Sequence, residues 1–270
     1  MTQIERNKME ITINQPLAFS KLGQRTNNED TLFPTLGKAN TETSLFLVCD
    51  GMGGADKGEQ ASRLLCEGIS EHFEANKFPI LERINLDEAL ENVYIKYTNF
   101  IEQNPLVNRM GSTLTLLQLH NKGISIAHIG DSRVYQLRNG KIIFQTKDHK
   151  QVNELVDAEI ITAEQALVHP WRNKLSRAVM AYSTNNGNGE ARKKDAADIT
   201  VIADIQKNDC FFLCTDGVLE QLSNDLLEKI ISETDDDSNK IATLLNICES
   251  ETKDNYSGYF IRVQNVLSDE

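Results

Sequence analysis

Two short apolar runs in the chain end in the same pair of residues. Residues 45–49 (Leu-Phe-Leu-Val-Cys) lead into Asp50-Gly51, and residues 211–215 (Phe-Phe-Leu-Cys-Thr) lead into Asp216-Gly217. Continuous apolar runs of this length predict buried strands, each of which would deliver a carboxylate to the point where the chain turns. An Asp-Gly pair alone is more often an ordinary hairpin turn, so a shared site needs support from other motifs.

The pattern between these two runs predicts helices first and then strands. One helix begins near Gly58, and a second runs from about Leu86, with Asn85 as its N-cap and Glu88 three residues on. Strands follow at residues 113–119, 124–129, 134–137 and 142–144. The last two flank Asn139-Gly140, which is a strong hairpin signal.

The remaining segments complete a mixed pattern. Residues 148–180 are polar and read as helical, with Thr162 and Gln165 as a capping box, and residues 184–189 read as a loop. Two further helices are predicted around residues 225–231 and 240–248, and a last strand near residues 259–263. Strands at both ends, with helices inserted after the first Asp-Gly, predict an α+β fold in which helices pack outside antiparallel sheets.

Composition narrows the function classes. The chain has 270 residues, with 40 Asp+Glu against 28 Lys+Arg and a net charge of -12, which counts against binding to nucleic acid or anionic lipid. No apolar stretch approaches the ~20 residues of a membrane span, and the polar start lacks an apolar signal region, so we expect a cytoplasmic protein. The five cysteines have no C-x-x-C spacing and the histidines have no zinc spacing. Any bound metal would therefore be held by oxygen.

Several further motifs support a metal site. Carboxylates that converge repel one another unless a cation holds them. Gly51 can offer its carbonyl to a metal because no side chain stands in the way. Upstream, residues 23–30 contain an Arg and an acidic pair, and Arg suits bidentate phosphate recognition. Gly130-Asp131-Ser132-Arg133 and Asp254-Asn255 each lie at a predicted strand end, although either alone would be an ordinary turn.

Together and in this order, the motifs resemble the metal-dependent protein phosphatases of the 2C type, the PPM family. The match runs from about residue 16 to 265 and is closest to the bacterial branch. The residues that carry it are Gly23, Arg25, Asn28-Glu29-Asp30, Val48-Cys49-Asp50-Gly51-Met52-Gly53-Gly54, Gly58-Glu59, Ala61-Ser62, Gly111-Ser112-Thr113, His128-Ile129-Gly130-Asp131-Ser132-Arg133, Leu213-Cys214-Thr215-Asp216-Gly217, Asp254-Asn255 and, in the bacterial flap, Ile160-Ile161-Thr162, His169-Pro170, Arg172-Asn173 and Arg177.

The resemblance implies the fold and the metal ligands. It implies one domain over residues 1–270: a central β-sandwich of two antiparallel sheets flanked by helices (αββα), with a flap at about residues 148–190. It also implies two Mg²⁺ or Mn²⁺ ions, with Asp50 bridging them. Asp216 and Asp254 would complete the shell of the first ion. The Gly51 carbonyl would bind the second, with Glu29 contributing through water.

The resemblance also implies the residues around the metal pair and the reaction. Arg25 would hold the phosphate, Asp30 would lie behind the ligands, and Asp131 with Asp216 would take a third, weaker ion. The reaction is hydrolysis of phosphoserine and phosphothreonine by a metal-activated water. The substrates would be phosphoproteins of a cognate Ser/Thr kinase, and the protein a monomer. A binding module of the same fold without activity, or a two-metal nuclease, are the alternatives. The intact Asp set counts against the first, and the acidic balance against the second.

Three positions depart from the family pattern. Met52 follows Asp-Gly, where some members have a His proposed as the acid for the leaving alkoxide. Lys150 stands where Ser is more usual, and Met180-Ala181 replaces a common Leu-Gly. We expect these changes to bear on substrate choice and flap mobility, and to leave the metal ligands intact.

Overall fold

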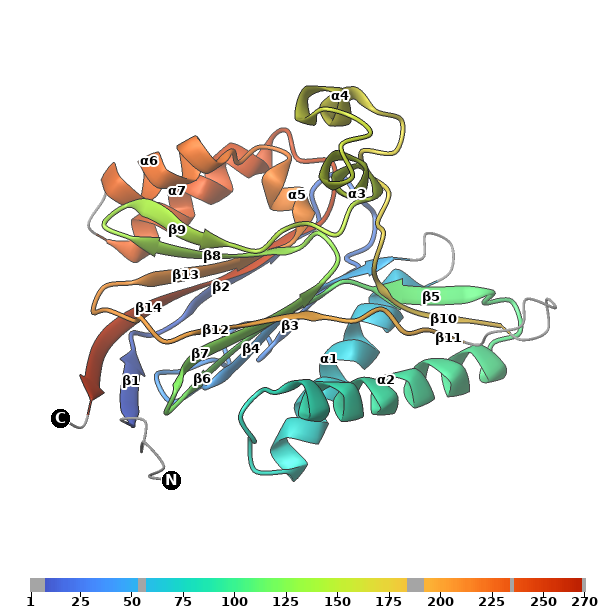
Figure 1. Ribbon diagram of the computed structural model, residues 1–270, viewed down its shortest axis with the longest axis horizontal. Coiled ribbons are helices and arrows are strands. Elements are labelled where there is room, and N and C mark those ends of the chain that lie inside the picture. The colour runs from blue at the N-terminus through green and yellow to red at the C-terminus, as the bar shows by residue number, and fades with distance from the viewer. Residues whose placement is uncertain (1–7, 53–56, 184–191, 234–235, 269–270) are drawn as a thin grey trace.

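Two antiparallel sheets lie face to face in the computed structural model (Figure 1). The structure describes residues 8–52, 57–183, 192–233 and 236–268. In the first sheet the order is β1 (Met9–Ile13), β14 (Tyr256–Ser268), β13 (Cys210–Cys214), β8 (Arg133–Arg138) and β9 (Lys141–Gln145), with β2 (Leu17–Lys21) also paired to β14. In the second sheet the order is β11 (Arg192–Lys193), β10 (Val179–Tyr182), β5 (Arg109–Ser112), β4 (Leu45–Met52), β6 (Leu114–His120), β7 (Gly123–Ile129) and β12 (Asp198–Ile202), with β3 (Asp30–Phe33) paired to β4.

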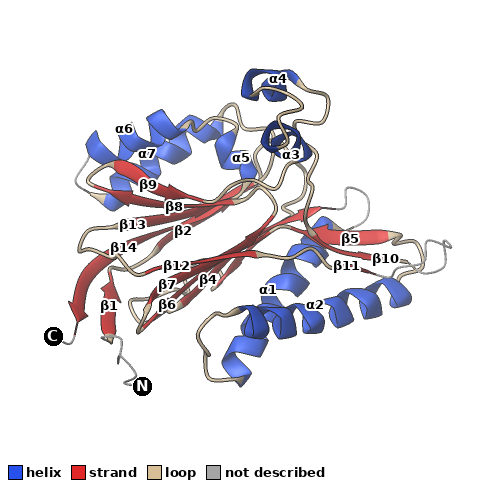
Figure 2. Ribbon diagram, in the orientation of Figure 1, coloured by secondary structure: helices blue, strands red, loops and turns tan. Residues whose placement is uncertain are grey.

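Helices cover the outer face of each sheet, which gives four layers (Figure 2). The second sheet is covered by α1 (Gly58–Ala75) and α2 (Arg83–Gln103). The first sheet is covered by α6 (Asn224–Glu233) and α7 (Asp237–Glu249), with the short α5 (Asp216–Leu219) after β13. Two short helices, α3 (Gln151–Asp157) and α4 (Ala163–Val168), stand apart from the layers near α5. The predicted αββα sandwich is confirmed.

The apolar runs are continuous because both faces of each central strand are buried. In β4, Leu45, Leu47 and Cys49 pack in the core beneath α1 and α2. Phe46 and Val48 point the other way, into the core between the sheets. β13 alternates in the same manner, since Phe211 and Leu213 join the core between the sheets while Phe212 and Cys214 face the outer helices. Side chains that alternate across a strand therefore fill two cores at once.

Several predicted elements are confirmed with shifted ends. The helix from Gly58, the Thr162–Gln165 capping box and the hairpin at Asn139-Gly140 are all present, and both hairpin residues have positive φ. The two later helices are α6 and α7. The predicted last strand is longer, since β14 spans Tyr256–Ser268. The predicted loop at residues 184–189 lies outside the described residues, as do Gly53 and Gly54.

Three predictions about element ends are wrong. Asn85 does not cap α2, because the helix begins at Arg83 and the Asn85 side chain instead donates to the Ile80 carbonyl at 2.8 Å. Residues 148–180 are not helical throughout, because only α3 and α4 form. Beyond α4 the chain is extended at His169, the residue before Pro170, where proline disfavours helix. Asp50 does not lie at a turn, because β4 continues through it to Met52.

No helix in the described part of the chain is long and apolar enough to cross a membrane.

Candidate active site

Asp50 is positioned by the same alternation that fills the core. It follows Phe46 and Val48 on the face of β4 that points between the sheets, and it pairs directly with Asp30 on β3. Its backbone is fixed, because its N–H donates to Thr113 Oγ1 and its carbonyl accepts from the Thr113 N–H, both at 2.9 Å. The carboxylate therefore stands on a rigid strand at the point where the apolar core ends.

Asp216 arrives from the opposite sheet. β13 ends at Cys214, Thr215 caps the next turn in an extended conformation, and Asp216 begins α5. The Thr215 hydroxyl donates to Asp30 Oδ2 at 3.0 Å and so ties the two sheets together at this end. Asp30, Asp50 and Asp216, which we call the central cluster, converge here from three different elements.

Burial and mutual repulsion disfavour the ionised forms of the carboxylates in the central cluster. Burial, opposed by hydroxyl hydrogen bonds and reinforced by Asp216 and Asp254, raises the pKa of Asp30 to about 7. Burial, together with Asp131 and Asp254, raises the pKa of Asp216 to about 7. The pKa of Asp50 lies well above its usual range for the same two reasons, burial and neighbouring carboxylates. Carboxylates that cannot all ionise beside one another suit an external cation.

The donor set of this cluster fits a hard divalent cation. Asp216 Oδ1 and Asp30 Oδ1 are buried and have no hydrogen-bond partner within the described residues. Buried polar atoms are almost always paired, so an unpaired carboxylate oxygen here is open to a proton, a water or a cation. All the converging side chains offer oxygen, which is the ligand that Mg²⁺ and Mn²⁺ prefer.

Gly51 stands in a cradle that excludes any side chain. A Cβ built on Gly51 would lie 2.0 Å from the Gly58 carbonyl oxygen and 2.7 Å from the Glu29 carbonyl oxygen. A Cβ on Gly58 would in turn lie 2.6 Å from the Glu29 side chain. The Gly51 N–H donates to the Glu29 carbonyl at 3.0 Å. Burial, Glu59 and Asp254 raise the pKa of Glu29, while Arg25 and the Gly58 N–H oppose them. Glycine at both positions brings the Glu29 carboxyl close to the end of β4.

Arg25 and Asp254 form the outer rim of the cluster. Arg25 Nη2 lies 2.7 Å from Asp254 Oδ2, and the two side chains are 56% and 35% exposed. The carboxylates of Asp254, Glu29 and Asp50 all raise the pKa of Arg25, with the hydrogen bond to Asp254 the largest cause. The guanidinium therefore faces the carboxylates and remains open to solvent, which suits a group that meets a phosphate.

Asn255 holds the segment that carries Arg25 and Glu29. Its Oδ1 accepts from the Glu29 N–H, and its Nδ2 donates to the carbonyls of Leu22 and Asn27, all three at 2.9 Å. Asn255 belongs to the Asp254-Asn255 motif, but its role is not apparent from the sequence. A buried Asn next to a ligand-type Asp was the available signal, since such an amide must find partners.

A second acidic cluster lies beside the first and differs in its charge balance. Lys150 Nζ lies 3.1 Å from Asp131 Oδ2 and 3.3 Å from Asp148 Oδ2. Arg133 binds Asp148 in a bidentate manner at 2.6 and 2.9 Å. We call Asp131, Asp148, Arg133 and Lys150 the flap-side cluster. Each carboxylate in this cluster forms an ion pair with a basic side chain of the protein.

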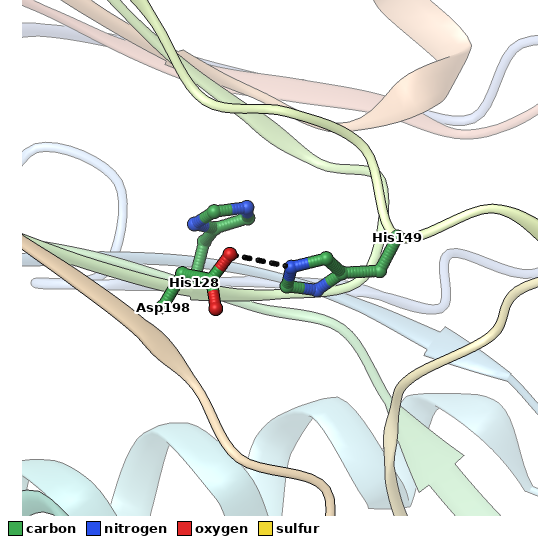
Figure 3. Close-up of side chains that lie close together, drawn as sticks. All are labelled: His128, His149 and Asp198. Atoms are coloured by element: carbon green, nitrogen blue, oxygen red, sulfur yellow. Dashed lines mark hydrogen bonds and ion pairs between the residues drawn. The ribbon is translucent and has the colours of Figure 1, made fainter. Parts of the chain in front are cut away.

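A stacked pair of histidines braces this region. The rings of His128 and His149 lie 4.5 Å apart, and Figure 3 shows His149 directed at Asp198. His149 Nδ1 accepts from the Gly130 N–H at 3.1 Å, so its Nε2 donates to Asp198 Oδ2, also at 3.1 Å. His128 Nε2 lies 2.9 Å from the Lys147 carbonyl and must donate to it. Although these three side chains are close enough to hold a metal, both Nε2 atoms carry protons. The group therefore fixes the loop before Asp131.

The structure brings most of the predicted site residues together. Contacts or mutual charge effects connect the whole set of Arg25, Glu29, Asp30, Asp50, Asp131, Asp216 and Asp254. Gly51 joins them through Glu29. The contact between Lys150 and Asp131 was not predictable from the sequence. Its departure from the usual Ser was visible, but nothing local showed where an ammonium at this position would lie.

The family is shown by a match along most of the chain. The profile of the family described as "Protein phosphatase 2C" matches residues 20–253. The chain belongs to this family.

Named relatives agree with the family. The chain is 29% identical over 203 residues to "Serine/threonine protein phosphatase PstP" of Mycobacterium tuberculosis, covering 75% of this chain and 36% of the relative. It is 30% identical over 190 residues to "Serine/threonine phosphatase stp" of Listeria monocytogenes, covering 69% of this chain and 71% of the relative. The chain thus spans only 36% of the length of the M. tuberculosis relatives that it matches.

Solved structures agree with the fold. The crystal structure of the M. tuberculosis phosphatase PstP/Ppp superposes with a TM-score of 0.77 at 26% identity, covering 94% of this chain and 100% of that one. The catalytic domain of PstP "in complex with 2 Manganese ions" superposes with a TM-score of 0.73, at the same identity and coverage.

Proposed function

We propose that this chain is a metal-dependent protein serine/threonine phosphatase that hydrolyses phosphoserine and phosphothreonine monoesters. The observation that carries the proposal is the central cluster, where buried carboxylates from both sheets converge and raise one another's pKa. At neutral pH, cations stabilise such a cluster by neutralising its charge. An exposed guanidinium on its rim provides a place for a phosphate dianion.

The proposed ligand set contains two ions. Asp50 contributes to both, because it stands at the centre of the charge cluster. Asp216 and Asp254 complete the set for the first ion. The Gly51 carbonyl would help to hold the second, with Glu29 contributing through water. The PstP structure that holds two manganese ions superposes on this chain at 26% identity, which supports a pair of ions of the Mg²⁺ or Mn²⁺ type here.

Bound there, the ions would neutralise a phosphomonoester dianion and activate a water for attack on phosphorus. The chain's own residues position the substrate and support the metal ligands. Arg25 binds the equatorial phosphate oxygens and holds the ester in line for displacement. Asp30 accepts from the Thr215 hydroxyl and keeps the two sheet ends in register behind the ligands. Met52 has no proton to donate to the leaving alkoxide.

The class of substrate and the setting follow from the proposed activity. We propose phosphorylated proteins as substrates and a Ser/Thr kinase as the enzyme that produces them. All five cysteines are buried and free, which supports a reducing compartment such as the cytoplasm. We propose that the chain acts as a monomer, which size-exclusion chromatography with light scattering would test.

Hydrolysis of a phosphothreonine peptide and of p-nitrophenyl phosphate, with Mn²⁺ and with EDTA, tests the proposal. We expect turnover with Mn²⁺, none after exhaustive chelation, and recovery on adding Mn²⁺ back. The matched control is Glu10→Gln, which removes one carboxylate from the far strand β1 and should leave turnover unchanged. Turnover that survives chelation would overturn the metal mechanism. A folded chain that binds Mn²⁺ without hydrolysing either ester would instead be a binding module.

A further inference from the structure

The ammonium of Lys150 lies against the carboxylate for which the family resemblance implies a third ion. Its Nζ is 3.1 Å from Asp131 Oδ2, and its positive charge opposes the rise in the pKa of Asp216. These are the same two residues, Asp131 and Asp216, to which the resemblance assigns the third, weaker ion. Family members usually have Ser at this position, which carries no charge.

The chain holds Lys150 in this place from several sides. The residue is the N-cap of α3, and its backbone pairs with Leu175 in an isolated bridge. The Gln151 N–H donates to the Lys174 carbonyl at 2.8 Å and fixes the next residue. The Lys150 side chain is only 19% exposed, whereas Asp131 and Asp148 on either side of its ammonium are 7% and 6% exposed. These contacts hold the Lys150 ammonium in a fixed position between two buried carboxylates.

The residues present do not fit a third divalent ion. A weak site of this kind depends on the negative charge of Asp131 and on space for several waters. Here Lys150 already neutralises Asp131, and a divalent ion bound there would lie next to a fixed positive charge. The second carboxylate that could contribute, Asp148, is held by both Lys150 and Arg133.

We propose that the Lys150 ammonium takes the place of the third metal ion, so that this chain binds two divalent ions where many relatives bind three. This inference rests on the two-ion centre proposed above. The cation at Asp131 would then be covalently part of the protein and independent of metal concentration. Its neighbour Asp216 would keep a nearby positive charge even when metal is scarce.

Counting bound Mn²⁺ tests the inference without relying on activity. The electron paramagnetic resonance signal of free Mn²⁺ gives the number of ions bound per chain as the metal rises into the millimolar range. We expect about two ions for the wild type and about three for Lys150→Ser, the third being weak. Lys150→Arg keeps the charge and should stay at about two. Adding Asp131→Asn to Lys150→Ser should return the count to about two.

A matched control excludes nonspecific binding to an acidic protein. Lys141→Ser makes the same residue exchange and the same change of net charge at the exposed end of β9, where Lys141 pairs with Glu228. It should bind the same number of ions as the wild type. Circular dichroism melts in Mn²⁺ establish that each variant is folded.

The outcomes separate this inference from the function on which it rests. A wild type that binds three ions, or a folded Lys150→Ser that gains none, overturns the role of Lys150. The wild-type count alone decides the matter if Lys150→Ser fails to fold. A wild type that binds no Mn²⁺, or whose count does not change with Asp50→Asn, overturns the two-ion centre itself.

Discussion

The central cluster and the flap-side cluster are neighbours that solve the same electrostatic problem in opposite ways. Asp30, Asp50 and Asp216 converge with no basic side chain bonded to them in the described structure, and burial and repulsion raise the pKa of each. Asp131 and Asp148 are as deeply buried, yet Lys150 and Arg133 contact them directly. The difference teaches where an external ion is required, since only the cluster without its own cations is incomplete as folded.

The largest expected effect comes from Asp50→Asn in the central cluster. Turnover should fall by at least about 10²–10³-fold, because losing a single transition-state donor already costs this much and Asp50 contributes to both proposed ions. The metal-free protein should become more stable, because one of three repelling carboxylates is removed. Rates with Mn²⁺ and melting curves in EDTA measure both. Near-normal turnover, or a lower melting temperature in EDTA, would contradict the comparison.

The matching change in the flap-side cluster, Asp148→Asn, should have the opposite effect on stability. It leaves Arg133 and Lys150 without their shared carboxylate, and breaking a largely buried ion pair costs about 3 kcal/mol. Urea unfolding in EDTA, compared with Asp50→Asn under the same buffer, measures the difference in sign. If both variants shifted the midpoint in the same direction, the two clusters would not differ as proposed.

Arg25→Ala separates phosphate binding from metal binding at the rim. KM should rise about 10–100-fold because a charged hydrogen bond to phosphate is lost. Mn²⁺ affinity should change less than about five-fold, because the exposed pair with Asp254 is worth about 0–1 kcal/mol. Substrate and Mn²⁺ titrations on the same variant give both values. An unchanged KM would remove Arg25 from the phosphate site.

The pH dependence of stability should show the smallest and most graded effect. The pKa values of Asp30 and Asp216 rise from about 4 in the unfolded chain to about 7 in the metal-free fold. The fold then binds more protons than the unfolded chain between these values. Metal-free stability should therefore be highest near pH 4 and fall by about 1.4 kcal/mol per pH unit for each excess proton up to pH 7.

Chemical denaturation in EDTA from pH 5 to 7.5 measures this slope. Saturating Mn²⁺ should flatten it, because the ions hold the carboxylates ionised. Asp50→Asn should reduce it in EDTA. A metal-free stability that rises with pH across this window would show that the central carboxylates are ionised without a cation.

Much of the fold was predictable because its central strands are apolar on both faces. The runs ending at Asp50 and Asp216 fill two cores and could be read directly. The strand β12 escaped prediction because it is an edge strand with one exposed face. β10 and β11 are two to four residues long, too short for a periodic signal.

The sequence predicted which residues converge at this end of the sandwich, but only some of their contacts. The carboxylates proposed as metal ligands occur in motifs with characteristic neighbours, so their order along the chain predicted that they form one site. The ion pair between Lys150 and Asp131 joins the N-cap of α3 to the loop that follows β7. Local spacing contains no information about such a contact. The same limit applies to Asn255, whose partners lie 226 to 233 residues away in the sequence.

The long sequence separation between Asn255 and its partners affects how the protein folds during synthesis. The Asn255 amide holds the segment that carries Arg25 and Glu29. This segment can therefore take its final conformation only after the residues next to β14 have been synthesised. Because contacts of this sequence separation are slow to form, a nascent chain would contain Asp50 before the proposed phosphate site could assemble. A ribosome that stops before Asp254 would release a chain that contains the Asp50 motif but cannot assemble the proposed phosphate site.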